Sequence, residues 1–348
     1  MDDADPRPGQ QGNANSIIPH SRPFIDEEDV RSVADVVRSG NLAQGERVEA
    51  FERSVARFLH QKGGAAVSSG TAGLHLALQA LGVHEGDAVA MPSYVCSALL
   101  HATESVGARP VLVDGSDEGY NLDPEDLERL GGRLPRGLAA VIVPHAFGSL
   151  CDISKVRDAV GDVPVVEDCA QAIGDPVVGL GDVIVCSFYA TKMMTTGEGG
   201  MVLSRDDGVI DRIRDMRDYD MKPDHRARFN YKMTDLQAAL GLSQLKKLPK
   251  FVDRRRELSR LYGREQRTCY RYVLPTSDLE SALNRFERKG IHARRPVYAP
   301  LHQYLGLPDS DFPKTSRAMR TALSIPLYPA LTDADVTRIR NAMREIFP

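Results

Sequence analysis

Short apolar runs alternate with segments of helical periodicity between about residues 65 and 205. VPVVEDCA (163–170) and DVIVCSFYA (182–190) are apolar first and polar at the end, which is typical of buried strands in a parallel sheet. Similar strands are predicted in AAV (65–67), AMP (90–92), PVLVD (110–114) and AAVIVP (139–144). Helical segments separate them, so the pattern predicts an α/β fold with a mostly parallel central sheet wrapped by helices.

The pattern is different on either side of this region. Helices are predicted from Asp26 to Gly40 and over 47–61, and a charge-rich, exposed loop over 218–230. A long helix follows over 236–266, interrupted at Pro249. We therefore expect three parts: a disordered tail over 1–15, a large cofactor-binding domain over 16–249, and a small C-terminal α+β domain over 250–348.

Polar side chains follow two of the predicted strands at the points where the strands end. Asp168 ends the first strand and Ser187 the second, and Lys192 follows in a small-residue turn before TTGEGG (195–200). Ligands of open α/β sheets bind at the carboxyl ends of strands. We therefore expect these three side chains to lie at one rim.

An aspartate, a serine and a lysine at one rim suit pyridoxal 5'-phosphate (PLP). Its aldehyde needs a lysine amine, its ring nitrogen an acidic partner, and its phosphate hydroxyls and backbone N–H groups. The pair Asp168 and Lys192 does not decide the question, because a lysine in a glycine-rich turn is usually a solvated surface residue.

A second stretch could supply the phosphate site. AAVSSGTAGLHLALQALG (65–82) combines a short strand, a turn of small residues and an amphipathic helix. Gly70 would allow close backbone approach and Thr71 offers a hydroxyl, but Ser and Thr are also ordinary helix N-caps. The stretch alone is compatible with a phosphate cradle or with a plain cap, and it matches no nucleotide-binding motif.

Composition narrows the class of protein. The net charge is −4, from 44 basic and 48 acidic residues, so no nucleic-acid partner is indicated. The five cysteines, at 96, 151, 169, 186 and 269, are scattered without a C-x-x-C pair. This argues against a disulfide framework or a metal site and for a reducing, cytoplasmic location. No apolar run reaches about 18 residues, so no membrane span is expected.

Taken together, these stretches resemble the DegT/DnrJ/EryC1/StrS family of PLP-dependent enzymes, which are mostly sugar aminotransferases of fold type I. The resemblance runs from about Pro19 to Thr332. Its motifs are SSGTAGLHLAL, MPSYV, GARPVLVD, VVEDCAQAIG, SFYATKMMTTGEGGMV, NYKMTDLQAALGLSQLKKL, YAPLH and SIPLYPALT.

The resemblance implies roles for individual residues. Lys192 would form the Schiff base with PLP and move protons at the substrate carbon, while Asp168 would pair with the pyridine nitrogen and Gln171 would lie near the ring hydroxyl. The phosphate would be held by Ser187, by Thr71 and by the backbone of residues 70–72, which are Gly70, Thr71 and Ala72. Asn230 would come from the neighbouring subunit of a homodimer. The reaction would move an amino group from glutamate or glutamine to a keto-sugar or cyclitol.

The sequence departs from the family pattern at three places. Cys96 stands where many relatives have an aromatic residue that stacks on the PLP ring, RDYDMK (217–222) replaces an Arg-x-His-Gly-like segment, and Phe229 replaces a common glycine. Two alternatives therefore stay open: an enzyme of the same fold with a different reaction or a non-sugar substrate, and a non-catalytic scaffold or regulatory homologue. The retained Lys192 argues against dehydratase relatives, which carry histidine there.

Overall fold

The computed structural model describes residues 16–117, 119–132, 137–263 and 270–347. The predicted disordered tail, residues 1–15, and Cys269 lie outside these described residues. No helix in the described part of the chain is long and apolar enough to cross a membrane.

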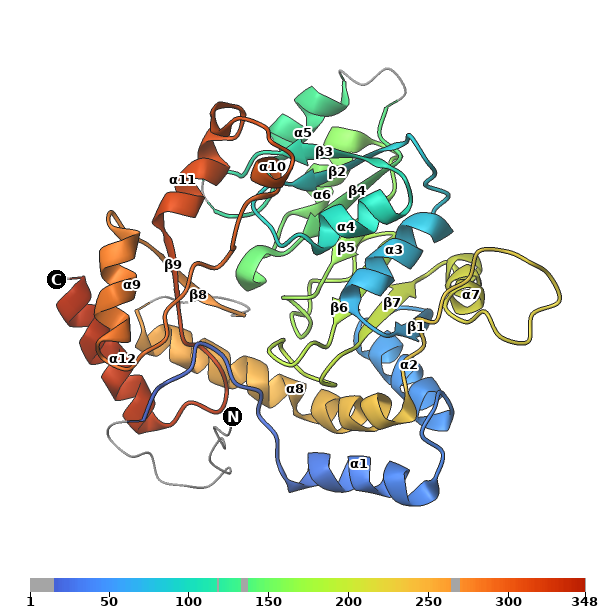
Figure 1. Cartoon of the computed structure of the whole chain (residues 1–348), viewed down its shortest axis with the longest axis horizontal. Helices are drawn as coiled ribbons and strands as arrows, with labels where there is room; N and C mark the ends of the chain where they lie inside the picture. The colour runs from blue at the N-terminus through green and yellow to red at the C-terminus, as the bar shows by residue number, and fades with distance from the viewer. Residues whose placement is uncertain (1–15, 118, 133–136, 264–269, 348) are drawn as a thin grey trace.

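A seven-stranded sheet forms the centre of the molecule (Figure 1). Its strands are β1 (Gly63–Val67), β2 (Ala88–Pro92), β3 (Arg109–Val113), β4 (Ala140–Pro144), β5 (Val165–Asp168), β6 (Val183–Ser187) and β7 (Gly200–Ser204). They lie in the order β1-β7-β6-β5-β4-β2-β3, and β7 alone runs in the direction opposite to the other six strands. The expected α/β fold with a mostly parallel sheet is confirmed.

Helices cover both faces of this sheet, as parallel strands buried on two sides require. The helices of this region are α1 (Glu27–Ser39), α2 (Glu46–Phe58), α3 (Gly70–Ala80), α4 (Ala98–Ser105), α5 (Pro124–Gly131), α6 (Ile153–Val160), α7 (Asp207–Met216) and α8 (Asp235–Leu261), with the 3₁₀ helix η1 (Ala146–Gly148). One core joins α3, α4 and α7 to the sheet. On the other face α2 and α8 form a second core and α5 and α6 a third.

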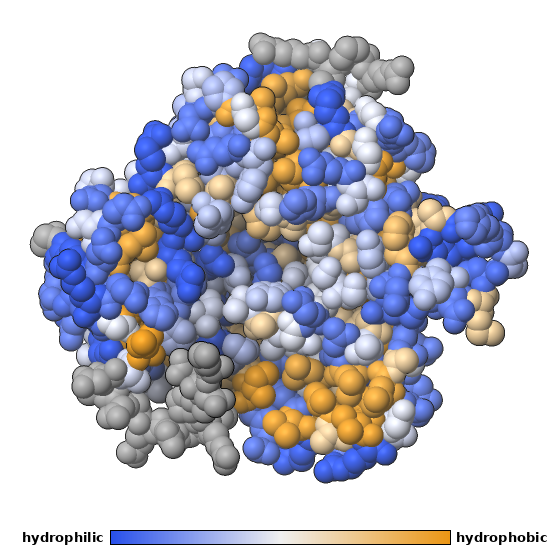
Figure 2. Space-filling model, viewed as in Figure 1, coloured by the Kyte–Doolittle hydropathy of each residue, from blue (hydrophilic) through white to orange (hydrophobic). Residues whose placement is uncertain are grey.

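The N-terminal helix α1 packs on α8 at the outside of the molecule (Figure 1). Figure 2 shows an apolar area on the surface over α1 and α8, and Val30 and Val37 of α1 are exposed. The start of α1 is a capping box at Asp26, and it ends at Gly40, which has φ +76°. Helix α3 differs from the predicted amphipathic helix, because nearly all of its residues are buried between the sheet and α4.

The C-terminal region forms a smaller α+β layer. Its elements are β8 (Tyr272–Pro275), α9 (Leu279–Glu287), α10 (Leu301–Tyr304), η2 (Asp309–Asp311), α11 (Pro313–Thr321), β9 (Ala322–Ile325) and α12 (Asp333–Ile346). Strands β8 and β9 pair antiparallel. The core of this layer includes Ile18 from the N-terminal segment and Leu258 from α8.

Helix α8 runs without a break through Pro249, so the predicted domain boundary at 249/250 falls inside it. Leu248 and Val252 pack under the central sheet, whereas Leu258 and Tyr262 pack in the C-terminal core. One helix thus belongs to both layers and connects them rigidly.

Candidate active site

Two adjacent parallel strands deliver Asp168 and Ser187 to the same edge of the sheet. Asp168 is the last residue of β5 and Ser187 the last of β6. The strands are in register, with Asp168 opposite Val185. Both side chains are 8% exposed. The shared rim predicted from the polar strand ends is therefore present.

The N-terminus of α3 meets Ser187 at this edge. Val67, the end of β1, pairs with Gly200, which also pairs with Ser187. A Cβ at Gly70 would lie 2.9 Å from the Ser187 Cβ and 3.3 Å from its Oγ, so only glycine allows this approach. The first turn of α3 thus lies directly against the hydroxyl of Ser187.

Both interpretations of the SSGTAG turn hold in part. Ser69 is the N-cap of α3 and accepts a hydrogen bond from the Ala72 N–H at 3.1 Å. Among the described residues the N–H groups of Gly70 and Thr71 donate to no acceptor. N–H groups without an acceptor at a helix N-terminus can bind an anion. With the exposed Thr71 hydroxyl and Ser187 beside them, they fit the phosphate of PLP.

Lys192 lies in the turn after β6, where its N–H donates to the Tyr189 carbonyl at 2.9 Å. Its Nζ is 5.3 Å from the centroid of the Tyr270 ring. Lys192 is also a source of positive potential at Asp168. Burial raises the pKa of Asp168, and the Ala170 N–H and Lys192 partly counteract that rise.

Gln171 has a defined orientation beside this rim. Its Oε1 accepts a hydrogen bond from the Phe147 N–H at 2.7 Å, and Phe147 has a positive φ of +58°. Because the oxygen must face this donor, the amide NH₂ is the end that remains to bind a ligand.

Two predicted site residues, Cys96 and Asn230, make no described contact with Asp168, Ser187 or Lys192. Cys96 is exposed in the turn between β2 and α4, at the carboxyl end of β2. Asn230 is exposed, and its side chain makes no hydrogen bond within the described chain. It ends the outlying loop 218–230, which projects from the body next to α7 (Figure 1).

Ion pairs and a ring stack order this loop. Arg228, only 5% exposed, bridges Asp215 and Asp224. Phe229 stacks on Tyr231 with ring centroids 4.9 Å apart and planes 11° apart, and meets the His75 ring edge-on. Phe229 at the place of a common glycine is therefore explained by packing within this chain.

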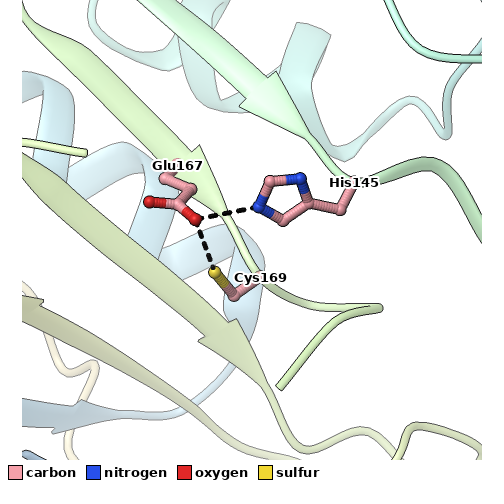
Figure 3. Close-up of side chains that lie close together, drawn as sticks. All are labelled: His145, Glu167 and Cys169. Atoms are coloured by element: carbon pink, nitrogen blue, oxygen red, sulfur yellow. Dashed lines mark hydrogen bonds and ion pairs between the residues drawn. The ribbon is translucent and has the colours of Figure 1, made fainter. Parts of the chain in front are cut away.

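Behind the rim, His145, Glu167 and Cys169 form a buried cluster (Figure 3). The Cys151 N–H donates to His145 Nδ1 at 3.0 Å, so His145 Nε2 carries the proton that it donates to Glu167 at 2.9 Å. The imidazole, carboxylate and thiol groups that could bind a metal thus already take part in hydrogen bonds. The partner of His145 is therefore Glu167, and its role is structural.

Glu167 also closes a turn. Its carboxylate accepts backbone N–H bonds from Gly179, Leu180 and Gly181 at 3.0, 2.6 and 2.7 Å. Burial would raise the pKa of Glu167, but His145 and these N–H groups hold it below its usual value. Alternation along β5 directs Glu167 and Asp168 to opposite sides of the sheet, so one acid anchors the strand end and the next faces the rim.

Sequence reasoning missed two acids, Glu167 and Asp235, and one tyrosine, Tyr270. Asp235 accepts from the Gly45, Arg47 and Val48 N–H groups at the start of α2. The partners of these residues are distant in the chain, so no local pattern indicates them.

A lysine, a buried aspartate and a helix N-terminus at one strand edge define the class of PLP-dependent enzymes with this fold. The sequence model of the DegT/DnrJ/EryC1/StrS aminotransferase family matches residues 23–344, and the chain belongs to that family of PLP-dependent aminotransferases.

Individual relatives cover nearly the whole chain. GDP-perosamine synthase of Vibrio cholerae is 30% identical over 95% of this chain and 99% of its own length. Spore coat polysaccharide biosynthesis protein SpsC of Bacillus subtilis is 32% identical over 95% and 97%. The solved structure of the aminotransferase TlmJ from Streptoalloteichus hindustanus is 29% identical, with a TM-score of 0.86 over 95% and 98%. The predicted family and enzyme class are confirmed.

Proposed function

We propose that this enzyme transfers an amino group from glutamate or glutamine to a nucleotide-linked keto-sugar, using PLP attached to Lys192. The observation that carries this proposal is the convergence of Lys192, Asp168 and Ser187 with the N-terminus of α3. The matched relatives add support, since several are GDP-perosamine synthases.

PLP, when bound, supplies an electrophilic carbon and a ring that accepts electrons from the substrate. Asp168 would pair with the ring nitrogen and favour its protonated form, because an anion stabilises an adjacent cation. A cationic partner would in turn offset the burial that raises the pKa of Asp168. Lys192 takes the proton from the substrate carbon and passes it on.

The remaining residues fix the cofactor in place. The Gly70 and Thr71 N–H groups and the Ser187 hydroxyl would bind the phosphate, while the Ala72 N–H stays with its cap. The Gln171 NH₂ would bind the ring hydroxyl. Cys96, exposed at the carboxyl edge of the sheet, is the predicted neighbour of the ring face.

Asn230 reaches the phosphate of a second subunit in a homodimer. Its exposure and its lack of a side-chain partner in the described chain support this assignment. We place the enzyme in the cytoplasm, because the four described cysteines are free thiols and a reducing compartment keeps them so.

The test is a half-reaction followed by absorbance. Glutamate or glutamine added to the PLP-loaded enzyme should remove the visible band of the lysine-bound cofactor, and a keto-sugar nucleotide should restore it. A band that neither donor removes would overturn the donor assignment and favour a different PLP reaction. Lys192→Ala should bind PLP without the band.

A further inference from the structure

Tyr270 is a buried tyrosine to which the proposed function assigns no role. It is 4% exposed and belongs to the core under the sheet, together with Cys169, Phe188 and Met193. Arg255 of α8 fixes its backbone by donating to the Tyr270 carbonyl at 2.9 Å and to the Leu327 carbonyl at 2.7 Å. The backbone of Tyr270 is thus anchored to helix α8.

The contacts of this ring converge on Lys192. Lys192 Nζ lies 5.3 Å from the ring centroid, within the range of a cation–π interaction. The Arg271 guanidinium carbon lies 5.2 Å from the same centroid. Thr191, the neighbour of Lys192, and Arg271 both lower the pKa of the Tyr270 phenol, against the burial that raises it.

No carboxylate forms an ion pair with Lys192 in the part of the chain that the structure describes. Within the described residues, the Tyr270 ring is therefore a direct contact of the amine. An aromatic face stabilises an ammonium more than a neutral amine, because only the cation is attracted to the ring quadrupole.

We propose that Tyr270 is the positioning residue for Lys192, and that its ring holds the amine, as an ammonium, whenever the lysine is not bonded to PLP. The inference rests on the proposed function. In transamination the neutral Lys192 amine removes a proton from the substrate carbon, becomes an ammonium, and regains its lone pair when it gives that proton away. Tyr270 steadies the charged form between these two transfers.

A purely structural Tyr270 would only fill the core. Its removal would then lower stability or open access to Lys192, and both effects are independent of the protonation of the amine. If the ring holds the Lys192 ammonium, its removal should change the reactivity of Lys192 only at a pH where the amine is charged. This pH dependence distinguishes the proposal from a purely structural role.

The experiment measures the modification of Lys192 by trinitrobenzenesulfonate in the full-length protein freed of PLP. This reagent reacts with neutral amines, and peptide mapping with Lys246 as an exposed internal standard gives the rate at each site. Tyr270→Met removes the ring and fills its space with a flexible apolar chain. We expect Lys192 to react about three- to tenfold faster in this variant at pH 7.5, and at the wild-type rate at a pH where every amine is neutral.

Tyr270→Phe is the second variant, and it keeps the ring. Burial would raise the pKa of the Tyr270 phenol, but Lys192, Arg271 and Thr191 lower it to about 8. We therefore expect the Phe variant to match the wild type at pH 7 and to react faster at pH 9, where the wild-type phenolate holds the ammonium more strongly.

Tyr272→Phe is the matched control, since it removes a buried hydroxyl that donates to the Tyr262 carbonyl instead. It should leave the Lys192 rate unchanged. Wild-type rates for Tyr270→Met at pH 7.5, or an equal acceleration at both pH values, would overturn the proposal. If Tyr270→Met does not fold, Tyr270→Phe decides: because it keeps the ring, a Lys192 rate at pH 7 that differs from the wild-type rate would overturn the proposal.

Failure of the proposed function would look different. In that case borohydride reduction of the wild type with PLP would leave Lys192 unlabelled, whatever the modification rates of the variants.

Discussion

Replacing Glu167 by glutamine should destabilise the protein although it keeps the size of the side chain. The carboxylate accepts hydrogen bonds from three consecutive backbone N–H groups. It also accepts one from His145, as Figure 3 shows. Oε1 faces His145 and Gly179, so a glutamine oxygen can take its place. The glutamine NH₂ would then replace Oε2 and face the N–H groups of Leu180 and Gly181.

The magnitude follows from these two donors. Each buried N–H left without an acceptor costs about 1–3 kcal/mol, so Glu167→Gln should lower the free energy of unfolding by about 2–6 kcal/mol. Glu167 is 0% exposed and its bond from Gly181 is buried, so water cannot replace the acceptor lost to Gly181. Leu180 is 44% exposed, which places the cost at its N–H at the low end of the range. The turn 179–181 and the end of β5 should loosen together.

Urea unfolding of the PLP-free protein measures this difference. The matched control is Glu49→Gln, whose side chain is 67% exposed and pairs with Arg53 at 3.5 Å; it should change stability by less than about 1 kcal/mol. A loss for Glu167→Gln as small as that of the control would refute the reasoning from the N–H donors.

The pH dependence provides a second check. The pKa of Glu167 is lowered in the folded protein, so its ionised form stabilises the fold above the pKa of the unfolded chain. That contribution is lost as the pH falls through the folded-state pKa. The difference between wild type and Glu167→Gln should therefore shrink in acid and stay constant near neutral pH.

Three further changes test the cofactor site and its loop. Gly70→Ala should weaken PLP binding by about 5- to 150-fold, because the new Cβ would lie too close to Ser187 and relieving this overlap costs about 1–3 kcal/mol. Titration of PLP fluorescence measures the affinity. Phe229→Gly should make the loop 218–230 more sensitive to trypsin, because it removes the stack that anchors the loop. Mixing Lys192→Ala with Asn230→Ala subunits should restore activity that neither variant has alone, as expected if each site takes Asn230 from its partner.

Controls and contrary results are specific to each change. Gly132→Ala, at an exposed helical position with φ −65°, should leave PLP affinity unchanged. Met221→Ala, at a 95% exposed side chain of the same loop, should leave trypsin sensitivity unchanged. Unaltered affinity in Gly70→Ala, an uncleaved loop in Phe229→Gly, or mixed dimers as inactive as their parents would each contradict the corresponding assignment.

The sequence predicts the sheet and its rim well because buried parallel strands are short, apolar and polar at their ends. Asp168 and Ser187 could be placed together by this rule alone. The reversed direction of β7 could not, since GMVLS has the same apolar pattern as a parallel strand. The continuity of α8 through Pro249 also depends on tertiary packing, with Leu248 and Val252 buried on either side.

The least predictable parts of the site are contacts between distant segments. Glu167 and Asp168 are adjacent acids, and only the turn at 179–181 reveals which one is structural. Tyr270 reaches Lys192 from a segment 78 residues further along the chain. Neither residue has a local sequence signal, because its role is decided by the partner that the fold brings to it.

The central claim is that Lys192 bears PLP. The most direct measurement is mass spectrometry of peptides from the wild-type protein after incubation with PLP and reduction with borohydride. We expect one pyridoxyl adduct, on Lys192. An adduct confined to other lysines, or a Lys192 peptide that stays unmodified, would contradict the account.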